Sequence, residues 1–193
     1  MTVAAWAPFV FCVAVLLGLA SMVHLRNRLV RLKSQVANAL ASIDAMLKKR
    51  HDLIPNLVAA VQGFMGHERD ILTRITELRA AALARKLPPP ERMAVEESLS
   101  RELAGLTVAV ENYPQLRSNE NVLQLQRALN EAEEQISASR RFYNSAVTEY
   151  NIALRTFPSN LVASMLAYRP EAPFQASEAE RQVPEVARLF GRS

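Results

Sequence analysis

The spacing of apolar positions predicts two long helices. We call a row of apolar positions that recurs along one side of a helix a seam. The first seam starts at Leu25, and the steps between its positions alternate between four and three residues, as in a helix packed along another helix. Its members are Leu25, Leu29, Leu32, Val36, Ala39, Ile43 and Met46. A second seam keeps the same alternation through Val122, Leu125, Leu129, Ala132, Ile136, Ser139, Tyr143, Ala146, Tyr150, Ala153 and Phe157. The second segment covers roughly 54 Å of helix, enough to lie along most of the first.

The first seam continues across a proline. Its phase breaks at Arg50 but resumes on both sides of Pro55, at Leu53, Leu57, Ala60 and Phe64. A loop at the proline would have no reason to preserve this phase. We therefore predict one continuous helix with a kink at Pro55.

Two shorter helices are expected between the long ones. The first carries an apolar stripe from Ile71 to Leu83, and the second opens near Glu91 and closes at Asn112–Pro114. A short amphipathic segment, 160–166, follows the second long helix. This order predicts an all-α fold, an elongated antiparallel four-helix bundle over residues 25–168, with an extended or mobile tail over 169–193.

The N-terminal segment reads as a membrane anchor. Residues 2–23 contain no charged side chain and would span roughly 33 Å as a helix, just over a bilayer's hydrocarbon core. No basic residue precedes them, which argues against a cleaved signal peptide. We assign residues 1–24 to a transmembrane anchor that includes Val3, Trp6 and Val23, with Cys12 as an apolar filler.

The flanking charges predict orientation and lipid contact. Four cations follow the span, at Arg26, Arg28, Arg31 and Lys33, and none precedes it. The positive-inside rule then places the N-terminus outside and residues 24–193 in the cytoplasm. This basic collar suits anionic lipid head groups. The net charge of +4 and pI of about 9.6 do not indicate nucleic-acid binding, because the basic stretches lack interleaved aromatic residues.

Catalytic motifs are not apparent in the sequence. The histidines His24, His51 and His67 lack metal-site spacing and are expected at the surface or as helix caps. No nucleophile elbow or Gly-rich phosphate loop occurs. We expect a protein that is not an enzyme, with no catalytic residue, no metal and no cofactor.

The stretch "KKRHDLIPNLV" (48–58) raises the question of a site. Pro55 has no amide for the carbonyl of His51, so that carbonyl needs another donor, either Asn56 or a side chain of a neighbouring helix. Arg50 either reaches outward or pairs with an acid, Asp52 or one on a neighbouring helix. We predict a kink and a candidate surface for packing or a partner, made of Arg50, Asp52, Pro55 and Asn56.

The second long helix adds two Tyr-Asn pairs to that candidate surface. Tyr143-Asn144 and Tyr150-Asn151 are seven residues apart, so both face the same way. The favoured interpretation is that the tyrosine rings fill the seam while hydroxyl and amide groups bond across helices and fix their register. The alternative is that they line a ligand groove.

The motifs resemble those of the LemA family. They are "NALASIDAMLKKRHDLIPNLVAAVQGFMGHE" (38–68), "ENYPQL" (111–116), "RRFYNSAVTEYNIALRTFPSNLVASMLAY" (140–168) and "VPEV" (183–186). The resemblance covers residues 25–186 and implies a single-span protein of the bacterial inner membrane with a four-helix bundle. It implies no catalytic residue. Leu40 stands where members commonly carry Trp, which leaves any role of that indole in doubt here.

Two functions are expected from these observations. The first is a membrane-anchored scaffold or adaptor, accessory to envelope or membrane-protein quality control, because members of the family are often encoded near membrane metalloproteases. Its partners would be membrane lipid and a membrane protease or envelope protein, with self-association left open and no nucleic acid. The alternative is a binding module for a small apolar or anionic ligand between the long helices, near Arg50, His51, Asn56, Tyr143 and Tyr150.

Overall fold

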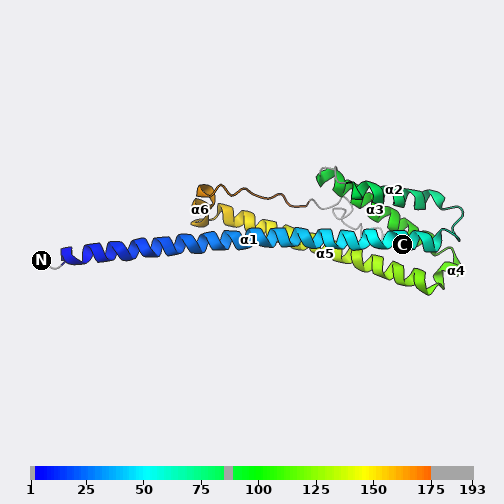
Figure 1. Cartoon of the computed structure of the whole chain (residues 1–193), viewed down its shortest axis with the longest axis horizontal. Helices are drawn as coiled ribbons and strands as arrows, with labels where there is room; N and C mark the ends of the chain where they lie inside the picture. The colour runs from blue at the N-terminus through cyan, green and yellow to red at the C-terminus, as the bar shows by residue number, and fades with distance from the viewer. Residues whose placement is uncertain (1–2, 85–88, 175–193) are drawn as a thin grey trace, which may run out of the picture. The chain divides into compact units, whose positions relative to one another are not determined.

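The computed structural model describes residues 3–84 and 89–174, without the side chains of 3–8, 89 and 90. These residues form helices and no strand, which confirms the all-α class for the described part of the chain. In chain order the helices are α1 (Val3–Val61), α2 (Arg69–Leu83), α3 (Pro89–Val110), α4 (Pro114–Arg117), α5 (Glu120–Arg155) and α6 (Ser159–Met165), as Figure 1 shows.

The chain divides into two compact units. Unit 1 comprises Met1–Ile43 with Ala138–Phe174, and unit 2 includes Asp44–Ser137. Helices α1 and α5 each contribute to both units. Residues 175–193, which include most of the predicted tail and the "VPEV" motif, lie outside the described residues.

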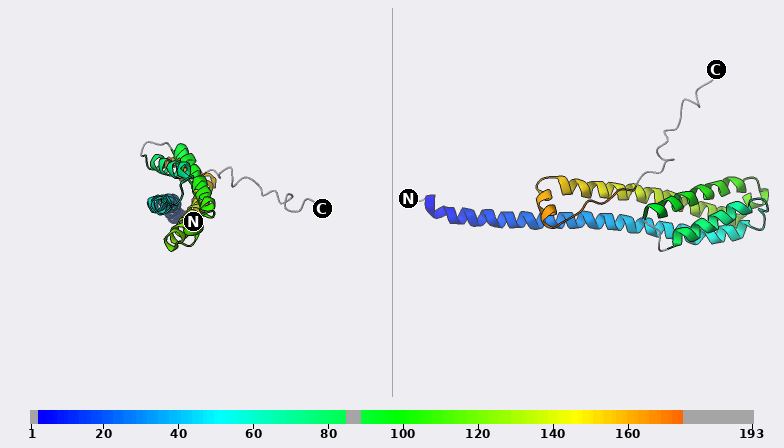
Figure 2. Two further views of the ribbon diagram at one scale, coloured as in Figure 1. Left: turned by 90° about the vertical axis from the view of Figure 1, so that its right-hand side faces the viewer. Right: turned by 90° about the horizontal axis from the view of Figure 1, so that it is seen from above.

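Unit 1 is built where α6 folds back beside α1 (Figure 2). Leu29 of α1 is buried with Ala153, Val162 and Ala163. The corner between α5 and α6 is fixed by Ser159, whose hydroxyl donates to the carbonyls of Ala153 and Thr156 at 2.7 and 2.9 Å.

A left-handed residue ends α6. Ala167 has a φ of 53°, and the amide of Tyr168 donates to the carbonyl of Ala163 at 3.0 Å. This is the 6→1 bond of a helix C-cap, in which the left-handed position is usually occupied by glycine and here by Ala167. The chain then continues to Phe174 without helix or strand.

Unit 2 has one core that draws on five helices. Its buried residues come from α1, α2, α3, α4, α5 and the α1–α2 connection. They are Ile54, Leu57, Val61, Met65, Leu72, Ile75, Leu99, Leu103, Leu106, Val110, Leu116, Val122 and Leu129. Burial of these side chains, at about 1.5–3 kcal/mol each, is the main stabilising term for the unit.

The helix α1 is continuous through Pro55, as its seam predicts. Most seam positions of α1 and α5 are buried or half-buried. The exceptions are Phe157, at 75% exposed, and Phe64, at 45%. Both lie beyond the end of their helix, because α5 ends at Arg155 and α1 at Val61. The kink itself stays a prediction.

The helix ends follow local chemistry. α1 ends at Val61, two residues before Gly63. α3 begins at Pro89 rather than at Glu91, since proline is tolerated in the first turn, where its missing amide would be unpaired anyway. The single turn α4 was not expected; Pro114 at its first position is the signal that could have indicated it.

The N-terminal part of α1 has no described helix beside it. The side chains from Phe9 to Leu19 are exposed, and Val23 is exposed as well. Within the described residues, α1 is long and apolar enough to cross a membrane. Val3 and Trp6 lie in α1, but their side chains are outside what the structure describes.

Candidate functional site

Arg50 lies at the centre of a buried charge network in unit 2. Its side chain is 0% exposed. The guanidinium pairs with the carboxylates of Glu96 on α3 and Glu133 on α5. It also donates to the hydroxyl of Ser100 at 2.6 Å. One arginine therefore joins α1 to α3 and α5.

His51 completes the network. Its Nε2 lies 3.0 Å from Oε1 of Glu96, and both side chains are buried. A carboxylate can only accept, so the Nε2 hydrogen points at Glu96. Burial raises the pKa of Glu96, but the hydrogen bond from His51 and the charges of Arg50 and His51 outweigh it. The net pKa lies below the ordinary value, so Glu96 is ionised at neutral pH.

The structure shows which of the two expected arrangements Arg50 adopts, and it corrects the expected position of His51. Arg50 pairs with acids on neighbouring helices instead of reaching outward. The expectation that His51 lies at the surface or caps a helix is wrong, because it is only 3% exposed. The reason is the acid opposite: Glu96 offers a buried acceptor to the imidazole and a counter-charge to the guanidinium.

The carbonyl of His51, which Pro55 leaves without its helical donor, is bonded from another helix. Nε of Arg79 on α2 donates to it at 2.7 Å. Of the two donors expected from the sequence, the side chain of a neighbouring helix is therefore the one used. Asn56 is exposed, as is Pro55.

The adjacent residues Arg50 and His51 thus connect α1 to three other helices. His51 reaches α2 through its carbonyl, and Arg50 reaches α3 and α5 through its guanidinium. Buried ion pairs contribute little net stability compared with apolar residues, but they penalise any register that separates them. This cluster is suited to fixing how the helices of unit 2 are aligned.

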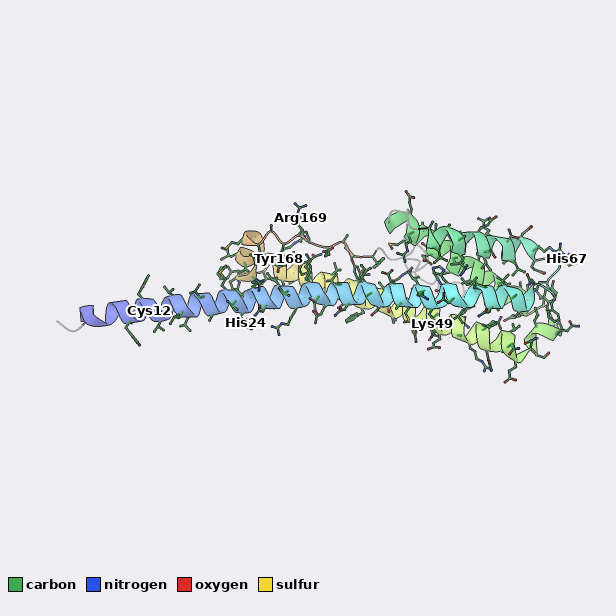
Figure 3. All side chains as sticks on the ribbon, viewed as in Figure 1. Cys12, His24, Lys49, His67, Tyr168 and Arg169 are labelled. Atoms are coloured by element: carbon green, nitrogen blue, oxygen red, sulfur yellow. The ribbon has the colours of Figure 1, made fainter. Side chains whose placement is uncertain are left out.

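The neighbouring lysines also have partners within unit 2. Lys48 pairs with the exposed Asp52 at 2.7 Å, one turn away on α1. Lys49, labelled in Figure 3, lies 3.5 Å from Glu131 of α5. Arg50, which belongs to the predicted partner surface, is buried and not accessible to a partner.

Sequence reasoning missed Glu96, Ser100, Glu133 and Arg79. A signal existed for Glu96, because it lies three residues before Leu99 and seven before Leu103, on the face of α3 that carries the apolar stripe. Arg79 gave no comparable signal in a helix whose other cations, Arg69 and Arg74, are exposed.

In unit 1 the two Tyr-Asn pairs of α5 bind the chain that follows α6. Asn144 donates to the carbonyl of Phe174 at 3.1 Å and accepts from the amide of Phe174 at 2.8 Å. Asn151 makes the same two bonds with Glu171, at 2.8 and 3.0 Å. Each amide side chain thus pairs with a backbone as a neighbouring strand would.

The tyrosines add one bond each. Tyr150 donates to the carbonyl of Arg169, and Tyr143 to that of Ala172, both at 3.1 Å. The ring of Tyr143 also meets that of Phe174 edge to face, with centroids 4.6 Å apart. Burial, with the charge of Glu171 as the second cause, raises the pKa of both tyrosines.

The distance between the two Tyr-Asn pairs along α5 matches the distance between the residues that they bind in the segment 169–174. Seven residues of helix rise about 10.5 Å, and three residues of extended chain span about 10 Å. Tyr150-Asn151 holds Arg169 and Glu171, and Tyr143-Asn144 holds Ala172 and Phe174, each contact three residues further on. The expected bonds are made, but to residues 169–174 rather than to another helix.

No group of three or more metal-binding side chains occurs within the described ranges. An open groove in unit 2 is lined by Val58, Gln62, Arg69, Leu72, Thr73, Thr76 and Glu77. It includes none of the residues predicted for a ligand site. Those residues are instead divided between the units, with Arg50, His51 and Asn56 in unit 2 and the tyrosines in unit 1.

Comparisons with a family model and with a curated protein both indicate a relationship to LemA proteins. The family model described as the LemA family matches residues 39–187. A protein named LemA from Metamycoplasma hominis is 28% identical, over 81% of this chain and 71% of its own length. Two magnetosome proteins, MamQ 1 and MamQ 2 of Paramagnetospirillum magneticum, are each 21% identical over 83% of this chain and 68% of their own.

Proposed function

This chain belongs to the LemA family, and from that premise we propose that it is a membrane-anchored helical scaffold or adaptor of the bacterial inner membrane. In this proposal the first turns of α1 cross the bilayer, with the N-terminus outside, and the rest of the chain is an elongated antiparallel four-helix bundle in the cytoplasm. Its role is accessory to envelope or membrane-protein quality control.

One observation carries the proposal. The helix that is long and apolar enough to cross a membrane also supplies buried residues to both units, because α1 runs without a break from Val3 to Val61. A helix shared in this way ties the folded part to the bilayer without a flexible linker. Such an arrangement serves to hold a surface near the membrane.

The polar clusters support a structural role over a catalytic one. The charges of Arg50 and Glu96 are neutralised by one another within unit 2. The side-chain amides of Asn144 and Asn151 each make two bonds to the backbone of residues 171–174. Polar groups that bond within the protein in this way keep the helices, and the segment after α6, in a fixed register.

The cations after the span support the orientation. Arg26, Arg28, Arg31 and Lys33 are exposed on α1, and the chain contains no acid before Asp44. Such a collar is retained on the cytoplasmic side during insertion.

The test is site-specific photo-crosslinking of the full-length chain in bacterial membranes. A benzophenone amino acid would replace Val108 on α3 or Leu83 on α2, which are exposed in unit 2. The control is Phe11, which is exposed in the apolar part of α1. We expect the same protein product from both unit 2 positions and not from Phe11. A spread of abundant membrane proteins, equal at all three positions, would contradict the proposal.

A differently tagged second copy in the same cells tests self-association. A crosslinked product containing both tags would identify the partner as another copy of this chain. No specific observation favours the small-ligand alternative.

A further inference from the structure

Large apolar side chains are exposed together where α5 turns into α6. Phe157 in the turn is 75% exposed, Leu161 is 54% and Met165 is 70%. Leu161 and Met165 are one turn apart on α6 and so lie on the same face of that helix. The opposite face, with Val162 and Ala163, is already buried against α1. We refer to Phe157, Leu161 and Met165 as the α6 apolar face.

The α6 apolar face is presented by a fixed corner. The hydroxyl of Ser159 bonds to the carbonyls of Ala153, near the end of α5, and of Thr156, just after it. The amide of Tyr168 closes the other end of α6. Because both ends are bonded and the inner face is buried, α6 cannot rotate to hide these side chains without losing Val162 and Ala163 from the core.

α6 is packed against the end of the apolar span of α1 and the turns that follow it. Leu29 shares its core, and Met22, Leu25 and Leu32 contact that core. Lys33 lies 5.7 Å from the centre of the Tyr168 ring. Figure 3 shows Tyr168 and His24 at this end of unit 1. A bilayer around residues 9–23 would therefore end close to the level of α6.

The charges at this end have one sign. No acid occurs between Met1 and Ile43, or between Tyr150 and Pro170. Arg155 at the end of α5 is exposed, as are Arg26, Arg28 and Arg31 on α1. Exposed apolar groups flanked by cations alone match the boundary between head groups and acyl chains of an anionic bilayer.

We propose that α6 is an interfacial element, whose apolar face inserts into the head-group boundary beside the transmembrane part of α1. The occupant of this face is lipid, and the inference rests on the proposed membrane anchoring. Two contacts with one bilayer, a spanning helix and a short helix lying at its surface, would set the tilt of unit 1 on the membrane.

The test uses the single native cysteine. In a Cys12→Ser background, Met165→Cys is labelled with an environment-sensitive fluorophore in the full-length chain, in vesicles of phosphatidylcholine and phosphatidylglycerol. Ser145→Cys, at an exposed position of α5, is the matched aqueous control. Native Cys12, labelled in the unmodified chain, reports on the span itself.

We expect the label at position 165 to lose most of its emission to lipids carrying a nitroxide near the ester carbonyl, and little to aqueous iodide. The label at 145 should respond in the opposite way. Equal iodide quenching at 165 and 145 would overturn the inference, as would protection at 165 from both quenchers, which indicates a protein cover. Failure of anchoring is distinguished by Cys12, whose label would then escape nitroxides placed deep in the acyl region.

Discussion

Nε of Arg79 lies 2.7 Å from the carbonyl oxygen of His51 and donates to it. This carbonyl is the one that residue 55 would bond in a regular helix, and residue 55 is a proline. A guanidinium from α2 thus replaces a missing amide of α1. The proline costs the helix one internal bond, and that bond is restored between helices.

Arg50→Met is expected to destabilise the protein strongly. The substitution leaves the buried Glu96 without its guanidinium, and removing one partner of a buried pair typically costs about 3–5 kcal/mol. Thermal and denaturant unfolding of the full-length protein in detergent, followed by circular dichroism, measures the change.

Lys49→Met is the matched control for this substitution. Its 3.5 Å contact with Glu131 is at the surface, where such pairs contribute at most about 1 kcal/mol. Equal losses for the two variants would show that burial of Arg50 does not determine its contribution.

Stability should fall in acid because of Glu96. Its pKa is lowered in the folded protein from an ordinary value of 4.5, so the folded state binds fewer protons than the unfolded state below that pH. This contribution is fully present above about pH 5 and is lost as the pH falls through the folded-state pKa. The melting temperature of Glu96→Gln should therefore decline less steeply below pH 5 than that of the wild type. Parallel profiles would contradict this role.

Asn144 and Asn151, which each hold one residue of the segment 169–174 by two hydrogen bonds, should act independently of one another. Asn144→Leu removes the acceptor of the Phe174 amide, and Asn151→Leu that of the Glu171 amide. Amide hydrogen exchange is expected to accelerate chiefly at Phe174 in the first variant and at Glu171 in the second. Each variant loses two hydrogen bonds, and each bond contributes about 1 kcal/mol to the stability of the folded protein. Unchanged exchange at both amides would mean that the two asparagines do not hold the segment.

The sequence was sufficient for the elements with strong periodicity. The seams of α1 and α5 follow from steps of three and four, and their phase across Pro55 predicts the unbroken α1. The need for a donor to the His51 carbonyl could be predicted, with Asn56 and a side chain of a neighbouring helix as the two candidates, because a proline leaves a defined group unpaired. The identity of that donor could not, since Arg79 is 28 residues away in the chain.

The partners of the Tyr-Asn pairs illustrate the other limit. Their spacing shows that both pairs face one direction, but a helix and an extended chain can both supply carbonyls at that repeat. Pro170 and Pro173 excluded a helix there without showing where the chain would lie. Burial of His51 likewise depended on the position of Glu96, an acid on another helix.

The double-mutant cycle of Pro55→Ala and Arg79→Met tests most directly the claim that residues 48–58 form a device for holding helices together rather than a reactive site. Pro55→Ala should retain the fold and straighten α1, because alanine supplies the amide that His51 lacks. Arg79→Met should then cost about 1.5–3 kcal/mol in the wild type, the usual loss for a bond to a charged group. In the Pro55→Ala background it should cost at least about 1 kcal/mol less.

Arg74→Met on the same helix is the control, because its pair with Glu102 is at the surface and should not couple to residue 55. Free energies of unfolding of the four proteins in detergent give the coupling. The predicted result is that the two substitutions at 55 and 79 together cost at least about 1 kcal/mol less than the sum of the single costs, while those at 55 and 74 are additive. Strict additivity at Arg79, or a largely unfolded Pro55→Ala protein, would contradict it.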